Sequence, residues 1–269
     1  DKVVSSVNLP YYYHHFSECR NDELLIDTLL AYYDEYTREQ QVNVIDFMID
    51  SLMSEGLSFR LENFISYKIN PSELTETHKR KIMDIALKYK SIILITFFGK
   101  LNEKSFIPIL RDFWKSNQKS SFSRSLESTL FRLGDSIIIE KWMSYMEKAP
   151  KKRDTLSISY YNYFEDIIEN GKNKKVFDRL LLIMLTYPNK QMRVDYAYPC
   201  CYQVFEPLSM FFYRSIFRYI KDAPIFDNRM KNRNVIKKDD VMYYNFPEEY
   251  KQKYLNWIKE HIDDYEFVE

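Results

Sequence analysis

LESTLFRLGDSIIIEKWMSYMEK, residues 126–148, is the stretch of sequence that decides the fold. It contains two apolar stripes with helical spacing. The first stripe is Leu126, Leu130 and Leu133, and the second is Ile138, Ile139, Trp142, Met143 and Met146. Between them, Gly134 can adopt the left-handed conformation that ends a helix, and Asp135 can cap the next one. Two short helices joined this tightly cannot bury both stripes alone, so the stretch predicts stacked neighbouring helices.

The composition of the 269 residues favours helices and argues against several classes of function. The chain has only 4 glycines and 9 prolines, whereas β folds and phosphate-binding α/β folds usually need more glycine in their turns. Its 39 basic and 39 acidic residues cancel, which makes a nucleic-acid partner unlikely because such proteins usually carry a basic excess. No apolar run is long enough to cross a bilayer. The longest candidate, residues 92–98 (IILITFF), fits a buried helix or a buried strand.

The three cysteines bear on the compartment. Cys19, Cys200 and Cys201 do not form a disulfide framework, which is typical of proteins from a reducing compartment. We therefore expect a cytoplasmic protein. The chain begins at Asp1 rather than Met, so a removed signal peptide remains compatible with the sequence. The sequence does not predict an oligomeric state.

Helical periodicity extends over most of the chain. Further helices are predicted at residues 23–33, 38–54, 57–67, 72–89, 102–116, 155–170, 173–186, 202–221 and 248–264. Residues 222–246 are polar and are expected to be irregular. Three domains follow from this pattern: an irregular N-terminal segment over 1–21, a repeat array over 22–186 and a divergent helical cap over 187–269.

The helix–turn–helix units align in one register. Leu101-Asn102-Glu103 falls on Leu133-Gly134-Asp135 with an offset of 32 residues, and Asn173 falls on Asp135 after a further 38. In FFGKLNEKSFIPIL and LFRLGDSIIIEKWM these turns resemble those of HEAT-like repeats of the PBS-lyase type, although Asn102 stands where the family has glycine. The resemblance is best over 90–148 and passable over 20–68 and 154–186. It implies an all-α fold, a right-handed α-solenoid of four to five HEAT-like helix pairs with a divergent C-terminal cap.

Two classes of function follow from this resemblance. Such repeats mostly build scaffolds that bind other proteins, so we expect a non-enzymatic protein–protein interaction scaffold, of which a bacterial immunity or antitoxin protein would be a specialised form. A minority act on nucleic acid, and the alternative is a HEAT-like DNA glycosylase or another nucleic-acid-binding protein. In that alternative Asp112 is the catalytic candidate, since it lies near Trp114 between Arg111 and Lys115. The simpler interpretation makes Trp114 a core residue.

Charge in the C-terminal third points to a binding surface. Residues 190–238 contain ten basic and four acidic residues, and the chain from Asp239 onward contains nine acidic residues and three lysines. In one interpretation, which we favour, the two stretches fold against each other and neutralise. In the other, Arg193, Tyr196, Tyr198 and Tyr202 are presented to another protein, and an acidic one would fit.

Motifs for metal or cofactor chemistry are missing. His14, His15 and Cys19 form one short cluster without the second ligand pair that a structural zinc site needs. The sequence contains no phosphate-binding loop, no dinucleotide fingerprint and no hydrolase motif. It therefore predicts no metal, no cofactor and no catalytic residue beyond the alternative at Asp112.

Overall fold

The computed structural model describes residues 23–120, 122–153, 155–156, 158–170, 173–194, 203–224, 235–238, 241–244 and 246–268. The structure is mostly helical (74% helix), which confirms the mostly helical character predicted from composition. The chain divides into two compact units, Asp1–Leu133 and Gly134–Glu269. This division falls inside the array predicted for 22–186, and the segment predicted for 1–21 lies outside the described residues. None of the described helices is long and apolar enough to span a membrane.

The described part of the first unit is entirely helical. In chain order it contains α2 (Glu23–Ala31), η2 (Tyr33–Glu35), α3 (Arg38–Glu55), α4 (Phe59–Tyr67), η3 (Pro71–Glu73), α5 (Glu76–Tyr89), α6 (Ile92–Leu101), η4 (Lys104–Phe106), α7 (Ile107–Ser116) and α8 (Phe122–Arg132). The apolar run at residues 92–98 is therefore a helix and not a strand. The helix predicted over 102–116 is divided into η4 and α7, and Pro108 lies in the first turn of α7, where its missing N–H costs nothing.

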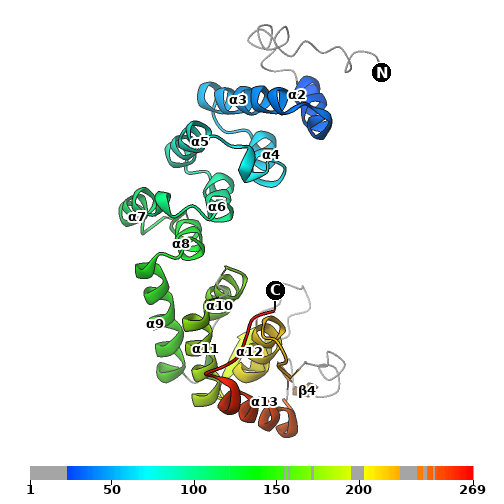
Figure 1. Ribbon diagram of the computed structural model, residues 1–269. Helices are drawn as coiled ribbons and strands as arrows, with labels where there is room; N and C mark the ends of the chain where they lie inside the picture. Colours follow the sequence, from blue (N-terminus) through cyan, green and yellow to red (C-terminus); the bar gives the residue numbers. More distant parts are fainter. Residues whose placement is uncertain are drawn as a thin grey trace. The chain divides into compact units, whose positions relative to one another are not determined.

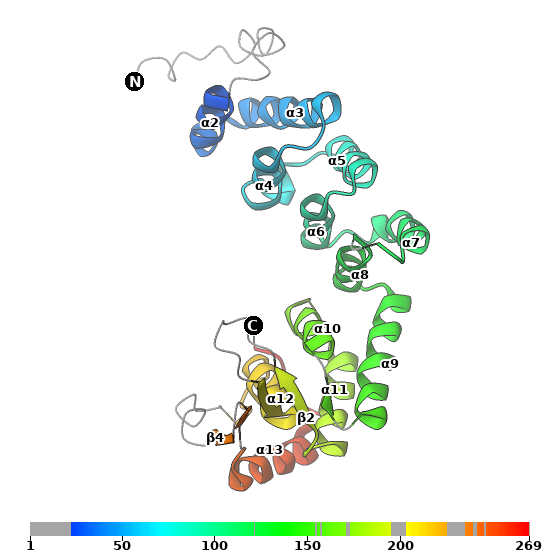
Figure 2. The same ribbon diagram turned by 180° about the vertical axis from the view of Figure 1, so that it is seen from behind.

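The helices of the first unit lie in two rows (Figures 1 and 2). One row contains α3, α5 and α7, and the other contains α4, α6 and α8. Within the second row α6 packs against both α4 and α8, while α5 of the first row also packs against α6. Consequently α6 is covered on three sides, and Leu94, Ile95 and Phe98 are completely buried.

The helix ends follow the local sequence. Thr37 caps α3 and Ser91 caps α6, each with its side-chain oxygen accepting from a backbone amide of the first turn. Asp135 accepts from two backbone amides at the start of α9 (Ser136–Lys152), as predicted. Gly134 has a φ of 85° and Asn102 has a φ of 52°. Both turns therefore use the left-handed region, and asparagine is the residue that most readily replaces glycine there.

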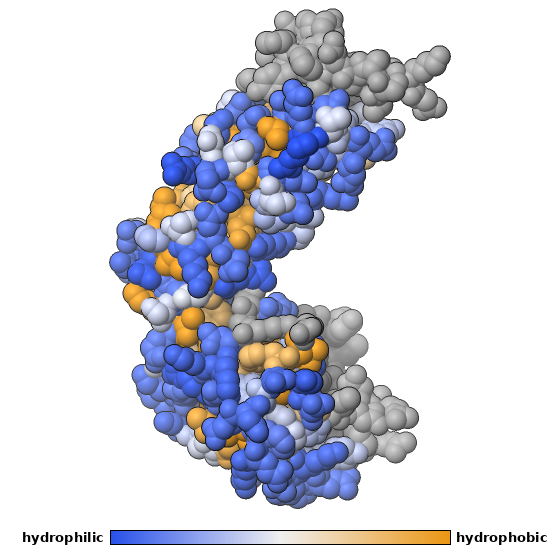
Figure 3. Space-filling model, viewed as in Figure 1, coloured by the Kyte–Doolittle hydropathy of each residue, from blue (hydrophilic) through white to orange (hydrophobic). Residues whose placement is uncertain are grey.

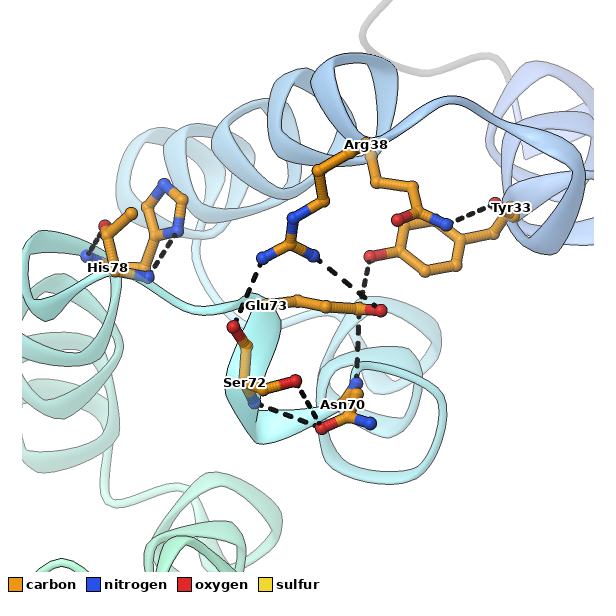
Figure 4. A network of polar contacts seen from close by, with 8 residues as sticks. Tyr33, Arg38, Asn70, Ser72, Glu73 and His78 are labelled. Carbon is orange, nitrogen blue, oxygen red and sulfur yellow. Dashed lines mark hydrogen bonds and ion pairs between the residues drawn. The ribbon is translucent and has the colours of Figure 1, made fainter.

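Glu73, in the turn between α4 and α5, connects three segments (Figure 4). Its carboxylate accepts hydrogen bonds from the Tyr33 hydroxyl at 2.8 Å and from the Asn70 backbone amide at 3.2 Å. Arg38, the first residue of α3, lies 3.8 Å from the same carboxylate and donates to the Ser72 carbonyl at 3.2 Å. Burial and the bond to Glu73 raise the pKa of Tyr33 above its usual range, so its hydroxyl stays protonated and can donate.

The second unit combines helices with a small sheet. Its elements are α9, β1 (Thr155–Leu156), α10 (Ile158–Asn170), α11 (Lys174–Thr186), β2 (Gln191–Val194), β3 (Gln203–Pro207), α12 (Leu208–Ile216), η5 (Phe217–Tyr219), β4 (Val235–Lys238), β5 (Val241–Tyr244) and α13 (Glu248–His261). The strand order is β1-β2-β3-β5-β4. The β1–β2 and β3–β5 pairs are parallel, and the β2–β3 and β4–β5 pairs are antiparallel.

This sheet corrects the prediction of a purely helical C-terminal cap. Residues 203–207 form a strand rather than the start of a helix over 202–221, because the residue before a proline prefers an extended backbone and Pro207 then ends the strand. Residues 235–244, predicted to be irregular, contain β4 and β5, which are rich in the β-branched and aromatic residues that strands favour. The fold is therefore mostly helical, which is consistent with the predicted all-α class, and it includes a small sheet.

Aromatic side chains dominate the core of the second unit. Phe164 of α10 stacks on Phe212 of α12 with ring centroids 4.2 Å apart and planes 11° apart. Tyr213 of α12 contacts Tyr254 of α13 at 5.5 Å, and burial raises the pKa of both hydroxyls to about 12. Such rings bury a large apolar area each, so they hold α10, α12 and α13 together.

We expect Tyr33→Phe to lower the free energy of unfolding by about 1–2 kcal/mol, because it removes a hydrogen bond to an ionised carboxylate without creating a cavity. Urea denaturation measures this difference. Tyr67→Phe is the control, since 72% of Tyr67 is exposed. The stability of this variant should match that of the original chain. Equal stability of the two variants would show that the Tyr33–Glu73 bond contributes nothing.

The ion pair of Glu103, at the start of η4, makes the free energy of unfolding depend on pH. The Nζ of Lys79 lies 2.7 Å from its carboxylate, and this bond holds the pKa of Glu103 below the usual 4.5. A carboxyl group with a lowered pKa stabilises the fold above its unfolded pKa, and that contribution is lost as the pH falls through the folded pKa. In Glu103→Gln we expect the free energy of unfolding to fall less steeply below pH 4.5. Urea denaturation at several pH values measures the free energy of unfolding of the variant and of the original chain. Equal slopes of this free energy against pH in the two proteins would contradict the prediction.

Candidate binding surface

The structure describes only one residue of the binding surface predicted in the C-terminal third. Arg193 lies exposed on β2, where its backbone is paired with that of Phe205 on β3. Tyr196, Tyr198 and Tyr202 lie outside the described residues. Their proximity to Arg193 therefore stays a prediction.

An ion pair joins the basic and acidic stretches of this region. Lys221 pairs with Glu266 at 3.2 Å, and its backbone amide donates to the Glu266 carbonyl. Ile220 also forms an isolated bridge with Phe267. Here the basic stretch lies against the acidic one, which fits the interpretation in which the two neutralise each other.

Asp112 and Trp114 point in different directions. Asp112 is exposed on α7 and forms an ion pair with Lys115 at 3.2 Å. Trp114 is buried, and its indole N–H donates to Glu127 of α8 at 2.9 Å. A hollow of about 480 Å³ follows α7, but residues 115–120 line it without a carboxylate. The structure thus does not bring the catalytic candidate together with the aromatic ring, and Asp112 is not among the residues that line the hollow.

The histidines that the structure describes are engaged in packing and capping. His78 is buried, and its Nε2 lies 3.0 Å from Asp46 while its Nδ1 accepts from the Thr75 backbone amide. Because that amide can only donate, Nδ1 is unprotonated in this bond. His261 stacks on Trp257 at 4.8 Å. The described part of the chain contains no group of three metal-ligating side chains, and the predicted cluster of His14, His15 and Cys19 lies outside it.

The outward face of the row α4, α6 and α8 is the candidate that sequence reasoning missed. Residues on it recur at three- or four-residue spacing, as the exposed stripe of a packed helix must. We call this face the α4–α6–α8 surface, and it consists of Phe59, Asn63, Tyr67, Ile92, Thr96, Lys100, Ser125, Ser128 and Arg132. Phe59 is 75% exposed, Tyr67 72% and Ile92 51%. Figure 3 shows apolar residues interrupting the polar surface of the first unit.

Contacts between helices place the basic and aromatic residues of this surface together. The Lys100 ammonium lies 4.0 Å from the centre of the Tyr67 ring and donates to the Ser66 carbonyl at 3.0 Å. Arg132 of α8 crosses α6 at Gly99, where an added Cβ would lie 2.8 Å from the Arg132 Cδ. Burial and then the neighbouring Arg132 charge lower the pKa of Lys100. Tyr67, Lys100 and Arg132 therefore form a continuous strip across three helices.

The carboxylates of these three helices do not reach the surface. Glu62 of α4 and Glu127 of α8 are each 5% exposed. Glu62 accepts a short hydrogen bond from Ser91, the cap of α6, and Glu127 accepts the bond from Trp114. Neither Lys100 nor Arg132 forms an ion pair within the described residues. The α4–α6–α8 surface is therefore cationic and aromatic, whereas α5 and α7 expose Glu76, Asp84 and Asp112.

Comparison with known proteins adds no relative. No family model, no curated protein and no solved structure matches this chain.

We expect Arg132→Gln to raise the pKa of Lys100 toward its ordinary value of 10.5, because the variant removes a neighbouring positive charge. The pKa should stay below 10.5, since burial still acts on the ammonium. Titration of the lysine side chains by NMR measures the shift, and Lys88 of α5 provides the reference signal. An unchanged Lys100 pKa would mean that the two cations do not interact.

Proposed function

We propose that the protein is a non-enzymatic scaffold that binds another protein through the α4–α6–α8 surface. The observation that carries this proposal is the strip formed by exposed aromatic side chains, the exposed Lys100 and the half-buried Arg132. The carboxylates of the same helices are buried. Tyr and Arg are enriched among the residues that dominate binding energy at protein interfaces, and charged groups placed beside them improve specificity. Phe59, Tyr67 and Ile92 supply apolar anchors on the same face.

The proposal includes the architecture. The two rows of the first unit support an α-solenoid of HEAT-like helix pairs, because each pair buries its apolar faces against the next pair. The equivalent left-handed residues Asn102 and Gly134 support a repeated turn. In such an array the row α4, α6 and α8 offers a partner one extended face. A bacterial immunity or antitoxin role and a cytoplasmic location remain predictions from the sequence.

The test is affinity capture from a lysate of the native source with the original chain and with the double variant Phe59→Ser/Tyr67→Ser. We expect the double variant to retain at least about 30-fold less of the bound protein, since losing an interface anchor costs about 2 kcal/mol or more. Both side chains are largely exposed, so folding should be unaffected.

Ile109→Ser is the matched control, because Ile109 is an exposed apolar residue (44%) on α7 in the other row. It should retain the partner as the original chain does. The proposal fails if the original chain retains no protein in stoichiometric amount, or if the double variant retains the same protein equally well.

A further inference from the structure

We propose that Lys100 and Arg132 form an anion subsite within the α4–α6–α8 surface, and that its ligand is a carboxylate of an acidic, amphipathic segment of the partner protein. This inference rests on the proposed function and specifies the chemistry of the partner. Apolar side chains of the segment would pack on Tyr67 and Ile92, while its carboxylates meet the two cations.

The two cations are held in position by the helices that carry them. Lys100 uses one of its three N–H donors on the Ser66 carbonyl and lies over the Tyr67 ring, which leaves further donors for a ligand. Arg132 lies across Gly99, the residue of α6 without a side chain to block it. The α6–α8 contact therefore brings two like charges together, and an anion bound between them removes their repulsion.

Among the residues that the structure describes, no carboxylate pairs with Lys100 or Arg132. The negative charge for this subsite therefore has to come from a ligand. Glu62 and Glu127, the carboxylates of α4 and α8, are buried and hydrogen-bonded to Ser91 and Trp114. α6 itself contains no acidic residue. Arg60, by contrast, is already paired with Asp27 at 3.0 Å, so it adds little attraction.

Several features favour an acidic protein segment over a nucleic acid. Nucleic-acid affinity depends on many phosphate contacts, but this surface offers two cations that form no ion pair with any residue the structure describes. The 39 basic residues of the chain are also balanced by 39 acidic ones. The Lys100 ammonium covers one face of the Tyr67 ring, which would otherwise be a platform for stacking a base. Large apolar side chains beside cations complement a segment that alternates apolar and acidic residues.

The experiment measures binding of a fluorescent amphipathic peptide, with leucines on one face and glutamates on the other, to the full chain. We expect the glutamate peptide to bind, its affinity to fall as salt rises, and a peptide with glutamine in place of glutamate to bind about tenfold more weakly. Lys100→Gln and Arg132→Gln should each weaken the glutamate peptide by about tenfold while leaving the glutamine peptide unchanged.

Two further variants separate the subsite from general charge. Lys88→Gln is the matched control, because Lys88 also lies over a tyrosine ring, that of Tyr89 at 4.7 Å, but on α5 in the other row. It should bind the glutamate peptide as the original chain does. Gly99→Ala keeps both cations but displaces Arg132, because the added Cβ would lie 2.8 Å from the Arg132 Cδ, so it should weaken binding of the glutamate peptide.

Three results would overturn the inference: no binding of the glutamate peptide, equal binding of both peptides, or tighter binding of a DNA duplex than of the glutamate peptide. If capture of a protein partner still depends on Phe59 and Tyr67 in that case, the scaffold proposal stands and only the anion subsite fails. If capture retains no protein, the proposed function itself fails.

Discussion

The packing of α6 between α4, α5 and α8 is the contact on which the first unit depends. It buries Leu94, Ile95, Phe97 and Phe98 to 1% exposure or less. One stripe of α6 remains at the surface, and it carries Ile92, Thr96 and Lys100. The candidate surface is thus the part of a core helix that its neighbours leave uncovered, and its position follows from the geometry of the core. Gly99 belongs to the same arrangement, since it lets α8 carry Arg132 across the helix.

Hydrogen bonding inside the first unit decides which charges reach this surface. A buried carboxylate is costly unless it is hydrogen-bonded. Glu62 meets this requirement through the cap of α6, and Glu127 meets it through the indole of Trp114. Each bond joins two neighbouring helices and at the same time removes a negative charge from the outward face. The cationic character of the surface is therefore a consequence of how the helices are joined.

The second unit is held together differently. Its core is a cluster of aromatic rings on α10, α12 and α13. The unit also contains a small mixed sheet. The sheet explains how a segment with little helical periodicity still forms backbone hydrogen bonds. The backbone N–H and C=O groups of each strand pair with those of a neighbouring strand. Gln203 pairs with Val241, far along the chain.

The sequence by itself determined the features that depend on neighbouring residues. These include the mostly helical fold, the apolar stripes, the cap at Asp135 and the left-handed turn at Gly134, because caps and helical spacing are local. Only the tertiary structure decided the pairing of β3 with β5, the burial of Glu62 and Glu127, and the meeting of Lys100 with Tyr67 and Arg132. Exposure of Ile92 inside an apolar run could have been suspected from its spacing with Thr96 and Lys100. The burial of particular carboxylates could not have been predicted from the sequence. It depends on hydrogen-bond donors that packing brings close from other helices, and the sequence does not specify the distances between those helices.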